Sequence, residues 1–191
     1  MSDNSEFVDQ AVSELVDCGC VHEVSFIPYM VNPLSVATNK SGKKRLILDL
    51  SVLNKFAKKQ KFKFEDWKLT IHLFKEDSYL YKFDLRSGYH HFDICPQQQT
   101  YLGFSWNGKY FCFTVLVFDL SSSPYLFTKC LREMVKYWRK NAINIVLYLD
   151  DGFGMSDSFG ECQKDYVFVK QSLVDAGFLT FLRKSPVCTQ H

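Results

Sequence analysis

The sequence lacks any long apolar run. Its longest uninterrupted runs, such as Ile145 to Leu149, fall far short of the ~20 residues that a membrane-spanning helix requires. The acidic start, Met1 to Glu6, also lacks the basic and apolar pattern of a secretory signal peptide. We therefore expect no membrane partner and an intracellular protein, with nothing in the sequence that separates nucleus from cytoplasm.

A disulfide framework is also missing. The seven cysteines are scattered and odd in number, which favours reduced thiols and agrees with an intracellular setting. Cys18, Cys20 and His22 are residue types that bind zinc, but their spacing is too tight for a zinc knuckle and no second ligand pair follows. We expect no zinc site.

Positive charge is absent from the first 39 residues, which contain six acidic side chains and no Lys or Arg. Between Lys40 and Lys68, ten basic residues stand against three acidic ones, a local net charge of +7. A solvated loop would explain the charge alone. However, cations beside aromatic rings are typical of nucleic-acid-binding surfaces, because the rings stack on bases while the cations neutralise phosphates. The rings among these lysines are Phe56, Phe62, Phe64 and Trp67.

Local patterns predict an α+β fold, with an antiparallel sheet backed by helices. With 47% hydrophobic and 16% aromatic residues, the 191-residue chain can bury a core in one domain or a pair of lobes. Apolar residues at helical spacing predict three helices, over residues 5–18, from Ser123-Pro124 onward, and over residues 162–176. Strands are predicted at residues 36–38, 45–50, 79–85, 101–106, 109–114, 145–149 and 178–181.

The helix after Pro124 has an apolar face and a basic face of the same period. Most such basic faces are simply solvated, but this one would also fit a phosphate backbone. Its basic residues are Lys129, Arg132, Lys136, Arg139 and Lys140.

Two adjacent carboxylates, Asp150 and Asp151, follow the apolar strand that ends at Leu149. A two-residue Asp151-Gly152 hairpin turn would account for one of them. It does not account for the second, because neighbouring like charges repel unless a cation lies between them. Alternation along strand 79–85 places Asp84 on the face away from the apolar side chains. The aspartates therefore predict a metal site on one sheet.

Five segments resemble the motifs of reverse transcriptases, in the order that the family has them, over about residues 33–185. FDLRSGYHHFDI resembles the motif with the first catalytic aspartate, and YLDDG resembles the Tyr-x-Asp-Asp motif. KKRLILDLSVLN is similar to the fingers strand, FTVLVFDLSSSPYLFTK to the nucleotide-pocket loop and its helix, and GFLTFLRKS to the late palm motif. GYHH, SSSPYLFTK and YLDDG are most similar to DIRS-like, tyrosine-recombinase retrotransposons.

The resemblance implies two-metal transfer of a dNTP to the 3′-hydroxyl of a primer on an RNA or DNA template. Asp84 and Asp150, assisted by Asp151, would hold two Mg²⁺ ions, with Mn²⁺ as the alternative, since hard cations prefer oxygen ligands. Lys184 would be the catalytic proton donor to pyrophosphate, although it would also be unremarkable as a surface lysine.

The same resemblance implies a nucleotide pocket and nucleic-acid contacts. Tyr89 would crowd the 2′ position of the sugar and Phe118 would line the ribose and base, unless both are ordinary core aromatics. The nucleotide-binding residues implied are Lys40, Arg45, Arg86, Ser87, Gly88, Tyr89 and Phe118. The nucleic-acid-binding residues implied are Lys43, Lys44, Lys129, Arg132 and Lys136.

Residues 1–78 would form the fingers and residues 79–191 the palm, with an interleaved fingers hairpin near 96–116 and no thumb. Asp119 stands where the family's Pro-Phe-Gly loop has glycine. Its carboxylate would oppose the triphosphate, and loss of glycine's positive φ would strain the loop. Ser51 also replaces an arginine that usually follows the fingers aspartate.

Three functions are therefore compatible with the sequence. The favoured one is the polymerase domain of a retrotransposon, whose thumb, nuclease and recombinase domains would lie elsewhere in a parent polyprotein. The second is a decayed or domesticated remnant that binds nucleic acid without catalysis. The third, a palm-fold nucleotidyl cyclase, shares the carboxylates but needs neither the basic fingers nor the basic helix face.

Overall fold

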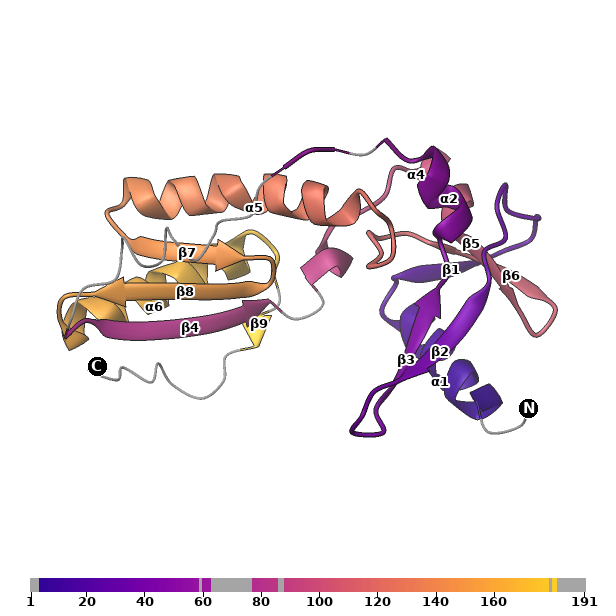
Figure 1. The fold of residues 1–191 in the computed structure, drawn as a ribbon, viewed down its shortest axis with the longest axis horizontal. Helices are drawn as coiled ribbons and strands as arrows, with labels where there is room; N and C mark the ends of the chain where they lie inside the picture. Colours follow the sequence, from indigo (N-terminus) through magenta and orange to yellow (C-terminus); the bar gives the residue numbers. More distant parts are fainter. Residues whose placement is uncertain (1–3, 59, 63–76, 86–87, 179, 182–191) are drawn as a thin grey trace. The chain divides into compact units, whose positions relative to one another are not determined.

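The computed structural model describes residues 4–58, 60–62, 77–85, 88–178 and 180–181. The chain divides into two compact units, each built from two stretches of sequence: Met1–Lys59 with Phe92–Ser123, and Gln60–His91 with Pro124–His191. Helices and antiparallel strands are combined in both units, so the predicted α+β class is confirmed (Figure 1). The naming of the units as fingers and palm stays a prediction.

The first unit contains a three-stranded antiparallel sheet in the order β1-β6-β5 and a separate β2-β3 hairpin. Gly19 follows its first helix with a positive φ, as the predicted helix stop requires. The elements of this unit are α1 (Ser5–Asp17), β1 (Val21–Val24), β2 (Leu34–Thr38), β3 (Lys44–Leu48), α2 (Ser51–Phe56), α4 (Pro96–Gln99), η3 (Thr100–Leu102), β5 (Gly103–Trp106) and β6 (Lys109–Phe113).

Aromatic packing forms the core of the first unit. The ring of Phe104 is fully buried, with centroids 5.2 Å from Phe111 and 5.7 Å from Phe113. Burial of each such ring contributes about 1.5–3 kcal/mol. The predicted Asn107-Gly108 turn joins β5 to β6, and both residues have the positive φ that this turn type needs.

The second unit contains a four-stranded antiparallel sheet in the order β7-β8-β4-β9. Phe83 of β4 contacts Trp138 of α5, and Tyr81 contacts Tyr166 of α6, so both helices pack on the same face of the sheet. The elements are β4 (Tyr79–Leu85), η2 (Gly88–His91), α5 (Ser123–Lys140), β7 (Asn144–Tyr148), β8 (Asp151–Ser156), α6 (Phe159–Asp175) and β9 (Thr180–Phe181).

Two glycines make room for the helix-facing rings of β4 against the sheet. Gly152 is opposite Phe83 in the β4–β8 register, and a Cβ atom at Gly152 would lie 2.0 Å from the Phe83 ring. Gly154 has the same relation to Tyr81, at 2.1 Å. Only glycine permits such close approach, so these residues fix the register of the two strands.

Among the described residues, no helix combines the length and the apolar character needed to cross a membrane.

Candidate functional site

The two adjacent aspartates lie at the turn between β7 and β8. Tyr148 pairs with Asp151, so Leu149 and Asp150 form the two-residue turn. The alternative of an Asp151-Gly152 turn is wrong, because Gly152 lies inside β8 beneath the Phe83 ring. Leu149 has a φ of 53°, a conformation that costs a non-glycine residue about 1–3 kcal/mol.

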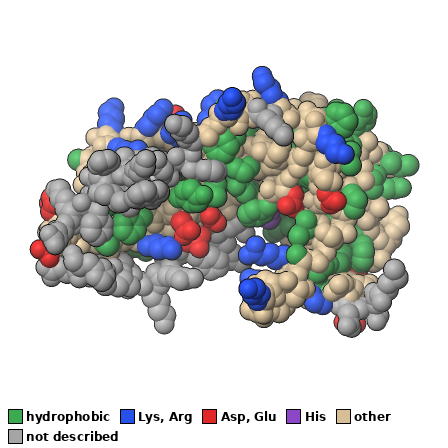
Figure 2. All heavy atoms as spheres, in the orientation of Figure 1, with side chains coloured by type: hydrophobic (Ala, Val, Ile, Leu, Met, Phe, Trp, Pro, Cys, Tyr) green, Lys and Arg blue, Asp and Glu red, His purple; other side chains and the backbone are tan. Residues whose placement is uncertain are grey.

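Strand pairing brings Asp84 to the same end of the sheet. Asp84 lies directly opposite Asp151 in the β4–β8 register, and Asp84 points to the face away from the helices, as alternation predicts. The amide of Leu85 donates a hydrogen bond of 2.9 Å to the carbonyl of Asp150, which ties the turn to β4. Figure 2 shows acidic side chains gathered over this end of β4 and β8.

These carboxylates are electrostatically crowded. Partial burial raises the pKa of Asp150, and the negative charges of Asp84 and Asp151 raise it further. Lys82 Nζ lies 3.3 Å from Asp151 Oδ1. Both partners of that ion pair are largely exposed, so it offsets the repulsion only weakly.

The donor chemistry of the site suits a hard divalent cation, because carboxylate oxygens are the ligands that Mg²⁺ prefers. Within the described part of the chain, however, no three His, Cys, Asp or Glu side chains are already grouped closely enough to hold a metal ion. The aspartates therefore fit a metal by chemical type and neighbourhood. Their side chains would have to converge further to bind one.

Tyr89 lies in the same unit as the aspartates. Its ring is buried against Phe127, with centroids 4.8 Å apart in an edge-to-face arrangement. Burial, and then the charge of Asp150, raise the pKa of the Tyr89 phenol. A Cβ atom at Gly88 would lie 2.7 Å from Phe127, so glycine makes room for this pair. The predicted site residues Arg86, Ser87 and Lys184 lie outside the described residues.

The basic tip of the β2–β3 hairpin lies in the first unit. Lys40, Lys43 and Arg45 are exposed there, and Lys44 Nζ lies 5.9 Å from the centre of the Phe7 ring. The sequence placed Asn39 at the start of a polar turn without assigning a role to its side chain, which organises this tip. Its Oδ1 accepts hydrogen bonds from the Ser41 amide (3.1 Å), the Ser41 hydroxyl (2.8 Å) and the Lys43 amide (2.9 Å). An asparagine before Lys-Ser-Gly is a turn signal, because its side chain can accept hydrogen bonds from backbone amides a few residues further on.

The loop with Val117, Phe118 and Asp119 also belongs to the first unit. Val117 is buried, whereas the Phe118 ring is 58% exposed. Asp119 is not among the described residues with positive φ, so the expected backbone strain at this position is wrong. Partial burial raises the pKa of Asp119, and the neighbouring Asp49 charge raises it further.

The basic residues of α5 have different roles. Lys129, Arg132 and Lys136 are exposed as expected, and Figure 2 shows Lys and Arg side chains along this helix. Arg139 instead donates hydrogen bonds from Nε and Nη2 to the carbonyl of Ile145, at 3.2 and 2.8 Å. It therefore joins α5 to β7, which helical periodicity alone does not reveal.

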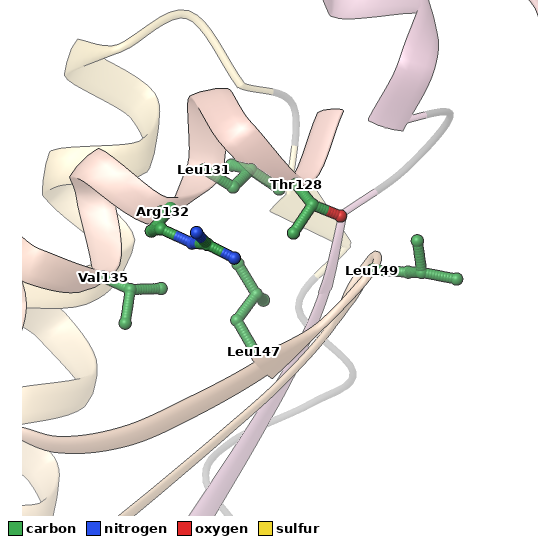
Figure 3. A pocket seen from close by; sticks show the side chains of 6 residues that line it. All are labelled: Thr128, Leu131, Arg132, Val135, Leu147 and Leu149. Atoms are coloured by element: carbon green, nitrogen blue, oxygen red, sulfur yellow. The ribbon is translucent and has the colours of Figure 1, made fainter. Parts of the chain in front are cut away.

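A small cavity of about 20 Å³ lies between α5 and the end of β7. Figure 3 shows α5 side chains on one side of it and Leu147 and Leu149 on the other. The α5 residues are Thr128, Leu131, Arg132 and Val135. The cavity is too small for a nucleotide, and we assign it no substrate.

Comparison with known proteins gives a family match for most of the chain. Residues 37–191 match the family described as reverse transcriptase (RNA-dependent DNA polymerase). An enzymatic polyprotein of Cassava vein mosaic virus is 26% identical over 79% of this chain and 23% of its own length. The Pro-Pol polyprotein of Feline foamy virus is 27% identical over 83% of this chain and 13% of its own length. The chain thus spans less than a quarter of these relatives.

The fold is also that of solved reverse transcriptases. The crystal structure of the Prototype Foamy Virus protease-reverse transcriptase has a TM-score of 0.81 and 23% identity, covering 99% of this chain and 25% of that one. A foamy viral protease-reverse transcriptase in complex with dsDNA has a TM-score of 0.83 and 22% identity, covering 99% of this chain and 39% of that one. The predicted reverse-transcriptase-like fold is confirmed, and with the family match over residues 37–191 the chain belongs to the reverse transcriptase (RNA-dependent DNA polymerase) family.

Proposed function

We propose that the chain forms the fingers and palm of a retroelement polymerase that adds dNTPs to a primer 3′-hydroxyl. The first unit corresponds to the fingers and the second to the palm. The observation that carries the proposal is the placement of Asp84 opposite Asp151, with Asp150 in the adjoining turn. The side chains of β4 that contact the described helices α5 and α6, Phe83 and Tyr81, lie on the opposite face of the strand from Asp84.

Asp84 and Asp150, with Asp151, would hold two Mg²⁺ ions, which supply activation of the primer hydroxyl and neutralise the triphosphate. Partial burial and then the neighbouring carboxylates raise the pKa of Asp150, and a cation would relieve the repulsion between those carboxylates. Tyr89, buried beside Phe127 and near Asp150, would crowd a 2′-hydroxyl and so select deoxyribonucleotides. Lys40 and Arg45 would neutralise triphosphate charge from the hairpin.

The proposed partners are a primer on an RNA or DNA template and a dNTP. Foamy viral protease-reverse transcriptases have been solved with dsDNA and with an RNA/DNA hybrid, which supports this substrate class. GYHH, SSSPYLFTK and YLDDG favour a DIRS-like retrotransposon as the source. A parent polyprotein would then supply the thumb, nuclease and recombinase domains.

Primer extension with dNTPs and Mg²⁺ on a homopolymer template tests the proposal. We expect Asp150→Asn to lower the extension rate by about 100-fold or more, because metal ligands act on charge that develops in the transition state. Affinity for the primer-template should stay nearly unchanged. Asp175→Asn, at the end of α6, is the matched control and should extend like the parent.

Extension by Asp150→Asn at the parental rate would disprove the two-metal assignment. A parent chain that binds primer-template but adds no nucleotide would instead identify a noncatalytic remnant of such an element.

A further inference from the structure

Asn54 in α2 connects two segments that lie 65 residues apart in the sequence. Its Nδ2 donates a hydrogen bond of 2.8 Å to the carbonyl of Asp119. Its Oδ1 accepts a hydrogen bond of 2.8 Å from the amide of Ser121. The side-chain amide therefore binds the loop backbone with a donor and an acceptor at once, as a neighbouring strand would.

The ends of this loop are fixed independently of Asn54. The buried Ser123 hydroxyl donates to the carbonyl of Val117 at 2.6 Å, and the Ser123 amide donates to the carbonyl of Leu120 at 2.9 Å. Val117 is itself buried. Asn54 thus holds the middle of the loop, beside the largely exposed Phe118 ring.

Asn54 is in turn held by the core of the first unit. The backbone amide of Asn54 donates a hydrogen bond of 2.8 Å to the carbonyl of Leu50, and Leu50 is 1% exposed. Asp49 Oδ1 accepts a hydrogen bond of 2.9 Å from the Ser51 amide, a local turn that leads into α2. A path of hydrogen bonds therefore runs from the core through α2 to the loop.

We infer that Asn54 is a positioning residue for the incoming nucleotide: it fixes the loop from Val117 to Ser121 so that Phe118 meets the base and ribose. The inference rests on the proposed polymerase function. It also accounts for how the loop is ordered without the proline and glycine of the family pattern, since side-chain hydrogen bonds constrain Val117 and Asp119 instead.

Asparagine is the residue type that this role needs. Alanine would remove both hydrogen bonds. Aspartate would keep the acceptor for the Ser121 amide, but its carboxylate would face the carbonyl of Asp119 and cannot donate to it. Both variants should release the loop, whereas a role in packing alone would be largely preserved in Asn54→Asp.

Hydrogen exchange on the full chain tests the two Asn54 side-chain hydrogen bonds without requiring activity. We expect the Ser121 amide to exchange about tenfold faster or more in Asn54→Ala and Asn54→Asp, while amides of β6 keep their protection. Asn141→Ala is the matched control, because Asn141 likewise donates from Nδ2 to a backbone carbonyl, that of Tyr137. Unchanged exchange at Ser121 would overturn the inference.

Nucleotide affinity tests the positioning role. The probe is a dNTP with Mg²⁺ on primer-template whose primer ends in a dideoxynucleotide, so that binding is measured without extension. We expect the dNTP Kd to rise about three- to tenfold in both Asn54 variants, with primer-template affinity unchanged and Asn141→Ala like the parent. In extension assays the same variants should raise KM more than they lower kcat.

The outcomes separate the two proposals. A parent that binds the dNTP without extending it contradicts the polymerase function and leaves the Asn54 comparison measurable. Parental dNTP affinity in both Asn54 variants overturns the inference while the polymerase function stands. A parent that binds no dNTP overturns both.

Discussion

The two units place their charged residues by different means. In the first unit, lysines lie on an exposed hairpin tip whose shape depends on one side chain, Asn39. In the second unit, Asp84 and Asp151 lie on paired strands, where the backbone register decides their positions. That register is fixed by Phe83 packed directly on Gly152. The comparison indicates that one side chain positions the basic tip, whereas the backbone register of the sheet positions the strands that carry the carboxylates.

The largest expected effect comes from disrupting the packing of Phe83 on Gly152, which fixes the strand register in the second unit. Gly152→Val places side-chain atoms inside the Phe83 ring and should destabilise the second unit by about 3 kcal/mol or more. Hydrogen exchange should show lost protection in β4, β7 and β8, with β6 of the first unit unaffected. Gly160→Ala is the control, since a Cβ atom there meets nothing within 4 Å. Equal stability of the two variants would show that the strands can shift register.

A smaller effect is expected from removing the side-chain hydrogen bonds of Asp9 within the first unit. Asp9 Oδ1 accepts hydrogen bonds from Trp106 Nε1 at 2.7 Å and Asn107 Nδ2 at 2.8 Å, joining α1 to the β5–β6 turn. Asp9→Ala should lower the free energy of unfolding by about 1–2 kcal/mol in urea titrations. Asp17→Ala, on the same helix, should change it by less than about 0.5 kcal/mol. A loss as large as that from Gly152→Val would contradict the expectation that these two hydrogen bonds contribute less than the packing of Phe83 on Gly152.

The role of Asn39 in positioning the basic residues is tested at the hairpin tip. Asn39→Ala removes the acceptor that organises Lys43 and should weaken primer-template binding about three- to fivefold, with unfolding free energy nearly unchanged. Filter binding at two salt concentrations measures this, and Asn141→Ala serves as the control. A loss of stability without a loss of affinity would mean that the tip is structural.

The smallest effect concerns the crowded carboxylates. Because the pKa of Asp150 is raised in the folded chain, its ionisation opposes folding. Protonated Asp150 contributes to the free energy of unfolding. This contribution is fully present below the ordinary aspartate pKa of 3.8 and is lost as pH rises through the raised pKa of the folded chain. Asp150→Asn should therefore raise Tm by about 1–2 °C at pH 7 without metal, and the gain should vanish below about pH 4.

The same Tm measurements are repeated with Mg²⁺. It should raise the Tm of the parent, because a ligand that binds only the folded state stabilises it, and should do so much less in Asp150→Asn. Asp175→Asn should behave like the parent in both measurements. A lower Tm for Asp150→Asn at pH 7 without metal would show that the ionised Asp150 carboxylate stabilises the folded chain.

Local patterns predicted much of the sheet. The strand from Tyr79 to Leu85 and the Asn107-Gly108 turn were found as expected, because alternation and positive φ are encoded by neighbouring residues. The position of Asp84 away from the helices followed from the same alternation. The reverse transcriptase motifs identified the fold because they retain their order along the chain.

Features that depend on distant residues were missed. The turn at Leu149 and Asp150 depends on Phe83 lying over Gly152, which no local pattern contains. Arg139 looked like one more residue of a basic face, yet its partner is a strand carbonyl. Periodicity describes which residues share a face, and it does not describe which long-range partner that face meets.

The interleaving of the two units has a consequence for synthesis. Strand β1 pairs with β6, and Val21 lies opposite Phe113, so the sheet of the first unit cannot close until residues far downstream have left the ribosome. Strand β4 emerges during that interval, and its partner β8 comes later still. Each sheet is therefore completed only after strands of the other unit have been synthesised, and a fragment that ends at Lys59 would contain β1 without its only described partner strand.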